Sequence, residues 1–122
     1  YYEINPENSY LARQVLNSQL KNLDKNEAKF LTKVRILEKE SAVNVTSSGS
    51  VDEYKIDVLV NFEIFNLSSD TLLFKSQSRG FANYDVSNSE YTNSLVQKEA
   101  LERALIDGIQ LMNIIIQSKI TE

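Results

Sequence analysis

Histidine, cysteine and tryptophan are absent from the 122 residues of this chain, which also has only 3 glycines and 1 proline. Without cysteine there is no thiol nucleophile and no disulfide framework. Cysteine usage therefore does not indicate whether the protein works in an oxidising or a reducing compartment. Without histidine there is no imidazole base, and without either residue there is no zinc site of the usual kind. These absences favour binding or assembly over catalysis, so we expect no enzyme activity, no cofactor and no bound metal.

The remaining composition is 42% apolar and 25% charged, with a net charge of −4. The apolar content is too high for a disordered chain, and the apolar residues are too dispersed for a membrane span. The length fits one domain over residues 1–122. The acidic balance argues against a nucleic-acid partner. Because the chain starts at Tyr1 without a signal peptide, we expect a mature domain or fragment whose N-terminal lipid or export signal is missing.

Helical spacing of apolar residues predicts two helices. The first covers about Pro6–Leu23 with Asn5 as its N-cap. The second covers about Glu90–Ile120, capped by a serine or asparagine among residues 87–89. Such a helix is about 45 Å long, whereas a domain of this size has a radius of gyration of about 14 Å. The helix therefore crosses the whole domain or bends, and Gly108 is the favoured place for a bend.

Alternating apolar residues between the helices predict three strands, over Leu31–Glu40, Lys55–Asn66 and Thr71–Tyr84. The serine-rich run Ser41–Asp52 is expected to form a flexible hairpin loop. Gly80 is expected to mark a bulge or a bend in the last strand. The order of elements predicts an α+β fold: a two-layer sandwich with a mostly antiparallel β-sheet and two helices packed on one face.

The two faces of this sheet are expected to differ, because neighbouring residues of a strand point to opposite sides. The even-numbered residues are apolar, Leu72 and Phe74 included, and we expect them to face the helices. The odd-numbered residues contribute Leu37, Leu59, Phe65, Leu73 and Phe81 to the other face. Its charges are six cations and mainly two carboxylates: Lys33, Arg35, Lys39, Lys55, Lys75, Arg79, Asp57 and Glu63.

This basic face has two interpretations. It is either an ordinary solvated face with cross-strand ion pairs, or a surface for an amphipathic anion or for the interior of a polar partner. The second interpretation makes Arg35, Lys55, Lys75 and Arg79 the candidate ligand-binding residues.

The C-terminal third carries a recognisable succession of motifs. Tyr84-Asp85-Val86 is followed by Ser89 and Tyr91, and then by the helical pattern Glu99-Ala100 and Arg103-Ala104. This succession resembles the lipopolysaccharide-assembly lipoprotein family (LptE), especially its alphaproteobacterial branch. The upstream order of helix, strands and glycine-containing loop is similar too, so the resemblance covers nearly the whole chain. The family pattern differs at Gln97, where a small residue is common, and at Gly108, where a larger apolar residue is usual.

The resemblance implies a fold, a place and a role. The fold is a two-layer α/β sandwich, and the place is the periplasmic side of the outer membrane. The anchor there is lipid on an N-terminal cysteine that this chain lacks. The role is to plug an LptD-like outer-membrane β-barrel and to help deliver lipopolysaccharide to the cell surface. Arg35, Lys55, Lys75 and Arg79 are then expected to contact lipid A or core phosphates. The alternative is a generic periplasmic lipoprotein domain that binds another envelope protein.

Overall fold

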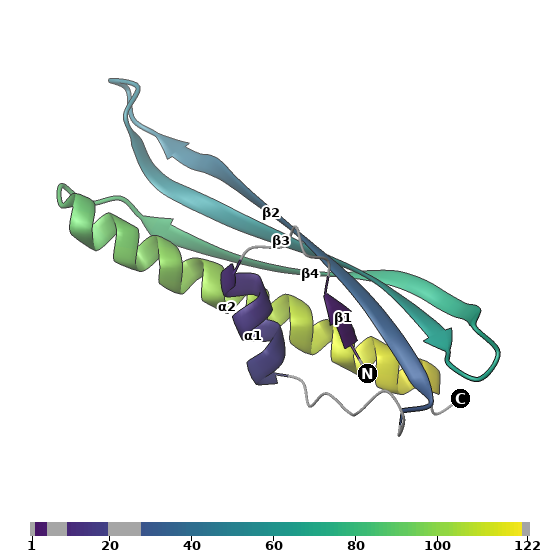
Figure 1. Cartoon of the computed structure of the whole chain (residues 1–122). Coiled ribbons are helices and arrows are strands. Elements are labelled where there is room, and N and C mark those ends of the chain that lie inside the picture. The colour runs from purple at the N-terminus through teal and green to yellow at the C-terminus, as the bar shows by residue number, and fades with distance from the viewer. Residues whose placement is uncertain (1, 5–9, 20–27, 121–122) are drawn as a thin grey trace.

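A computed structural model of the chain describes residues 2–4, 10–19 and 28–120 (Figure 1). The elements in chain order are β1 (Tyr2–Ile4), α1 (Tyr10–Gln19), β2 (Phe30–Val45), β3 (Val51–Asn66), β4 (Thr71–Asp85) and α2 (Glu90–Ile120). The sheet order is β1-β2-β3-β4, in which β1 is parallel to β2 and the other pairs are antiparallel. Both helices pack on one face of the sheet, which confirms the predicted two-layer α+β fold.

The predicted ranges of the two helices can be compared with the structure to different extents. α2 has the predicted bounds, and the Oγ of Ser89 caps it by accepting a hydrogen bond from the backbone N–H of Thr92 at 3.2 Å. α2 is one uninterrupted helix through Gly108 and crosses the length of the sheet (Figure 1). The predicted cap Asn5 and both ends of the predicted first helix lie outside the described residues.

The predicted loop Ser41–Asp52 is wrong, because most of it is strand. β2 continues to Val45 and β3 begins at Val51, so the turn takes only residues 46–50. Backbone bonds close this turn, and Gly49 adopts a φ of 86° that favours glycine. Of the five residues added to β2, all but Val43 pair with a residue of β3, and this pairing satisfies their backbone groups regardless of the serine-rich composition.

The core lies between the even-numbered face of the sheet and the helices, as the alternation predicts. Residues of β3 with no more than 1% exposure form its centre: Val58, Val60, Phe62 and Ile64. The helices contribute equally buried side chains: Leu16, Leu105, Ile109 and Met112. Burial of these side chains is the main favourable term in the free energy of folding.

The predicted inward position of Leu72 is wrong, because β4 contains a bulge. Ile64 pairs with Phe74, but the next residue of β3, Phe65, pairs with Leu72, so Leu73 has no partner on β3. The extra residue moves Leu72 to the face that carries Phe65. Leu72 and Leu73 are accordingly 47% and 48% exposed.

The prediction that Gly80 marks a bulge or bend is also wrong. Gly80 pairs in regular register with Val58, and its role is to let the α2 backbone approach β4. A Cβ at position 80 would clash with the carbonyl oxygen of Ala104 and lie 2.6 Å from the backbone nitrogen of Gly108. Beside it, the Oγ of Ser78 donates a buried hydrogen bond of 2.6 Å to the carbonyl oxygen of Gly108. Helix and sheet therefore meet backbone to backbone at this point.

Candidate functional site

The face of the sheet opposite the helices is uncovered in the described part of the chain, and we call it the open face. Its members pair across the three long strands. From β2 they are Lys33, Arg35, Leu37 and Lys39; from β3, Lys55, Asp57, Leu59, Asn61, Glu63 and Phe65; from β4, Leu72, Lys75, Gln77, Arg79, Phe81 and Asn83. The six predicted cations therefore do share one face.

Each of the five cross-strand rows of the open face from Lys33 to Lys55 contains a cation. Lys33, Glu63 and Lys75 form one cross-strand row, so a single carboxylate lies between two ammonium groups. The next row is Arg35, Asn61 and Gln77, and the row after that ends with Arg79. Three of the four candidate residues thus lie in consecutive rows. The fourth, Lys55, is six residues from Asn61 on β3, which is about 20 Å along the strand.

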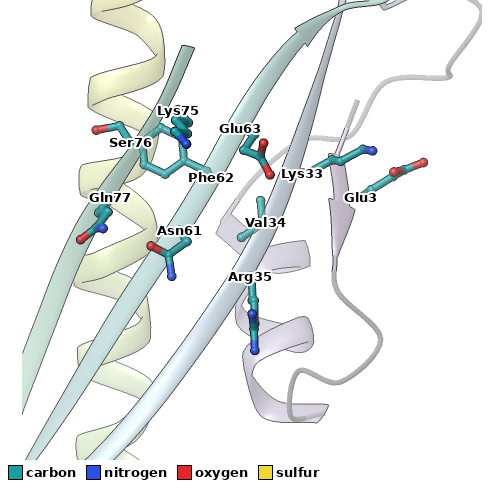
Figure 2. A pocket seen from close by; sticks show the side chains of 10 residues that line it. All are labelled: Glu3, Lys33, Val34, Arg35, Asn61, Phe62, Glu63, Lys75, Ser76 and Gln77. Carbon is teal, nitrogen blue, oxygen red and sulfur yellow. The ribbon is translucent and has the colours of Figure 1, made fainter. Parts of the chain in front are cut away.

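An open hollow of about 800 Å³ lies over the first two rows (Figure 2). Its lining comes from all four strands: Glu3, Lys33, Val34, Arg35, Asn61, Phe62, Glu63, Lys75, Ser76 and Gln77. Three cations and two carboxylates line it, so the hollow is net positive although the chain is net negative. It can accept an anionic group from solvent without deep burial.

The sequence identified two of the cations in this hollow, Arg35 and Lys75, as candidates. It missed Lys33 as a site residue, although the shared odd parity with Arg35 could have included it. It missed Glu3 altogether, because three residues of β1 carry too little pattern to predict their parallel pairing with β2. Both Glu3 and Glu63 reduce the positive charge of the hollow.

Lys55 and Lys33 already have partners on the open face. The Nζ of Lys55 lies 3.6 Å from Oδ1 of Asp57 and 4.9 Å from the ring centre of Phe81. The Nζ of Lys33 lies 5.0 Å from the ring centre of Phe65. These contacts hold apolar rings against cations at the surface. Phe81 remains 62% exposed, so the face offers apolar contact beside positive charge.

The described residues contain neither a metal-type cluster nor a membrane-length helix. No group of three or more aspartates and glutamates in ranges 2–4, 10–19 and 28–120 is arranged to hold a metal ion. No helix within the same ranges is long and apolar enough to cross a bilayer.

A second polar cluster lies on the face of the sheet that the helices cover, where Tyr84 contacts Glu40. The hydroxyl of Tyr84 donates a hydrogen bond to Oε1 of Glu40, and Nε2 of Gln97 donates to the same oxygen at 3.0 Å. The ring of Tyr84 stacks on Tyr54 with 5.5 Å between centres. Burial and the Glu40 carboxylate raise the pKa of Tyr84 well above its ordinary value. The hydrogen bonds of this cluster connect β2, β4 and α2. Gln97, where the family pattern commonly has a small residue, makes one of these structural contacts.

Replacing this hydroxyl tests the cluster. Tyr84→Phe is expected to lower the free energy of unfolding by about 1 kcal/mol at neutral pH. Because the folded-state pKa of Tyr84 is raised, its contribution is complete below the unfolded-state pKa of about 10 and is lost as the pH rises further. Denaturant melts above pH 10 should therefore show a steeper loss for the wild type than for Tyr84→Phe. Tyr91→Phe, at a residue 80% exposed, is the control; equal pH slopes for wild type and Tyr84→Phe would contradict the assignment.

Comparison with solved structures finds this fold in bacterial lipoproteins. The rare lipoprotein B of Shewanella oneidensis has a TM-score of 0.67 at 15% identity, over 98% of this chain and 95% of that one. The minor lipoprotein of Acinetobacter baumannii has a TM-score of 0.68 at 12% identity, over 91% and 84%. Lipoprotein B of Nitrosomonas europaea has 0.62 at 12% identity, over 92% and 77%.

At the level of sequence, neither a family model nor a curated protein matches the chain. The likeness to the three lipoproteins is thus one of structure: the chain has the fold of rare lipoprotein B, an LptE-like fold. It agrees with the motif resemblance in the C-terminal third. The alphaproteobacterial branch stays a prediction.

Proposed function

We propose that this chain is a non-enzymatic assembly factor of the LptE type, which plugs an LptD-like outer-membrane β-barrel and contacts lipopolysaccharide during its transport to the surface. The observation that carries the proposal is the net-positive hollow on the open face of a rare-lipoprotein-B fold. The lipoprotein neighbours support anchoring by lipid. We place this anchor on the periplasmic side of the outer membrane. The lipidated cysteine would precede Tyr1 in a longer form of the protein.

The chemistry of the open face suits an amphipathic anion. Phosphates of lipid A or of the core would accept charge-assisted hydrogen bonds from Arg35 and Lys75 in the hollow, and from Arg79 and Lys55 beyond it. Arg35 offers the planar guanidinium that binds phosphate through two parallel bonds. Exposed apolar side chains lie close by on the same face: Leu37, Leu72 and Phe81. They could cover part of an acyl chain while the phosphates stay at the cations.

Co-expression with an LptD-like barrel tests the main claim. We expect the two proteins to purify together as a stable complex after detergent extraction. Absence of a complex, with both proteins folded and present in the same membrane, would refute the plug role. Binding of lipopolysaccharide is a separate measurement, so the two parts of the proposal can fail independently.

Charge reversal on the open face tests the binding residues. Arg35→Glu with Lys75→Glu is expected to weaken lipopolysaccharide binding about tenfold or more at low salt. Lys55→Glu with Arg79→Glu should weaken it less, because Asp57 already balances Lys55. The control is Lys98→Glu with Arg103→Glu, which makes the same change of charge on exposed positions of α2. Equal losses of binding in all three double variants would show a general charge effect and would mean that the open face is not the binding surface.

One observation favours the second candidate, a lipoprotein domain that binds another envelope protein. The β2–β3 hairpin projects beyond the end of β4 and away from α2 (Figure 1). Near its tip, Val43 and Val45 are 49% and 56% exposed. Exposed apolar residues on a projecting hairpin are typical of a contact with protein. Co-purification with an envelope protein other than a barrel would favour this candidate.

A further inference from the structure

The outer edge of β4 is a long row of backbone groups without partners. β4 is the last strand of the sheet and pairs with β3 on one side only. Among the residues that the structure describes, no strand and no side chain bonds to its other side. An edge of this kind is a template for pairing with another strand.

The part of β4 suited to pairing is the segment from Lys75 to Asp85, which contains no proline. The bulge at Leu73 interrupts the strand before this segment. The segment is regular, since every residue in it pairs in unbroken register with β3. Eleven residues exceed the usual length of a β-strand.

We infer that this segment pairs with the same segment of a second copy of the chain, antiparallel and about a two-fold axis at Gly80. In that register Lys75 lies opposite Asp85 of the second copy, Gln77 opposite its Asn83 and Arg79 opposite its Phe81. The pairing joins two sheets into one and makes the two open faces continuous. It does not rest on the proposed function.

Charge favours this register over two neighbouring ones. Moving the axis by one residue to Arg79 places the two copies of Arg79 opposite each other, and moving it to Gln77 places Lys75 opposite Arg79. Like charges directly opposite each other destabilise a strand pair, and opposite charges stabilise it. With the axis at Gly80, both ends of the paired segment carry a lysine facing an aspartate.

Asp85 supplies a second reason, because its own sheet does not balance its charge. It lies directly opposite Glu53 on β3, so two carboxylates face each other. The described residues offer Asp85 no ion pair. Lys75 of the second copy would put a cation on the free side of Asp85.

Cysteine pairs test the register without interference, because the chain has no cysteine of its own. Lys75→Cys with Asp85→Cys is expected to form a covalent dimer on mild oxidation, since facing residues on paired strands match disulfide geometry. The two positions are about 33 Å apart within one strand, so they cannot join inside one copy. Each single variant, and Lys75→Cys with Asn83→Cys, should form much less dimer. Equal yields from all of these variants would contradict the register.

The mass of the unmodified protein in solution, measured by light scattering, tests the association itself. We expect a dimer at high concentration and a monomer for Asp85→Lys, which places lysines opposite each other. Asp85→Lys should melt no earlier than the wild type, because it also relieves the contact with Glu53. The exchanged pair Lys75→Asp with Asp85→Lys should restore the dimer. A wild type that stays monomeric at millimolar concentration would overturn the inference, with no bearing on co-purification with a barrel.

Discussion

Replacing Gly80 by alanine is expected to lower the free energy of unfolding by about 3 kcal/mol, more than any surface change. The added Cβ would meet backbone atoms of α2, the carbonyl oxygen of Ala104 and the nitrogen of Gly108. Backbone of a packed helix cannot move aside as the end of a long side chain can. The helix must lift from β4, which also lengthens the buried hydrogen bond from Ser78 to Gly108. Urea denaturation followed by circular dichroism measures the loss.

Gly108→Ala is the matched control, because it adds the same methyl group from the other side of the interface. Its Cβ would meet Cγ2 of Val60 at 3.1 Å and the backbone nitrogen of Gly80 at 3.3 Å, contacts that a shift of a few tenths of an ångström relieves. Alanine also gains about 1 kcal/mol over glycine within a helix. We expect the two effects in Gly108→Ala nearly to cancel. Equal destabilisation by both variants would show that the close approach at Gly80 is not the cause.

Phe62→Ala is expected to cost about 3–5 kcal/mol, the usual loss for a buried aromatic residue in a core. Phe62 is 1% exposed, and its ring meets that of Phe74 edge to face with centres 6.5 Å apart. The smaller side chain would leave a cavity between β3 and the helices. Thermal and urea melts measure the change, and Phe62→Leu gives a milder variant where the alanine variant fails to fold.

Phe65→Ala is the comparison for Phe62→Ala, since it removes the same side chain from the same strand on the open face. Phe65 is only half-buried and contacts the ammonium group of Lys33. We expect a loss of about 1 kcal/mol or less, in keeping with the size of a surface cation–π contact. Similar losses at both positions would mean that the two faces of β3 are equally packed, contrary to the structure.

Much of this fold could be predicted because local rules and packing agree. The alternation from Ile56 to Ile64 identifies the buried face, and the same alternation places the cations of Lys33 and Arg35 together. Ser89 caps α2 where a capping residue was expected. In these places the preference that decides the structure, strand alternation or helix capping, is contained within one strand or helix. These features can therefore be predicted from the sequence alone.

The rest depends on contacts between elements that no single stretch of sequence contains. Ser41–Val45 forms strand because β3 lies opposite, although its composition is typical of a loop. Leu72 and Leu73 are both apolar, so alternation cannot reveal a bulge between them. Gly80 has several ordinary explanations, and only the position of α2 identifies the correct one.

The candidate site, like the fold, could be predicted from the sequence only in part. The open face follows from parity, so its cations could be predicted, including Arg79 and Lys55. The hollow could not, because it needs the cross-strand register that places Glu63 between Lys33 and Lys75 and the parallel strand that brings Glu3. Partners such as Asp57 beside Lys55 decide which cations remain available, and they too depend on side-chain positions.

The order of strands in the sheet has a consequence for how the chain folds. β2, β3 and β4 are joined by two short turns and pair as neighbours in sequence, so these hairpins close only short loops of chain. Such local pairing favours rapid folding. The steps that bring distant segments together are the docking of α2 over Gly80 and the pairing of β1 with β2. We expect the three-stranded meander to form early and α2 to be added late, so the contact between Gly80 and Ala104 would be made near the end of folding.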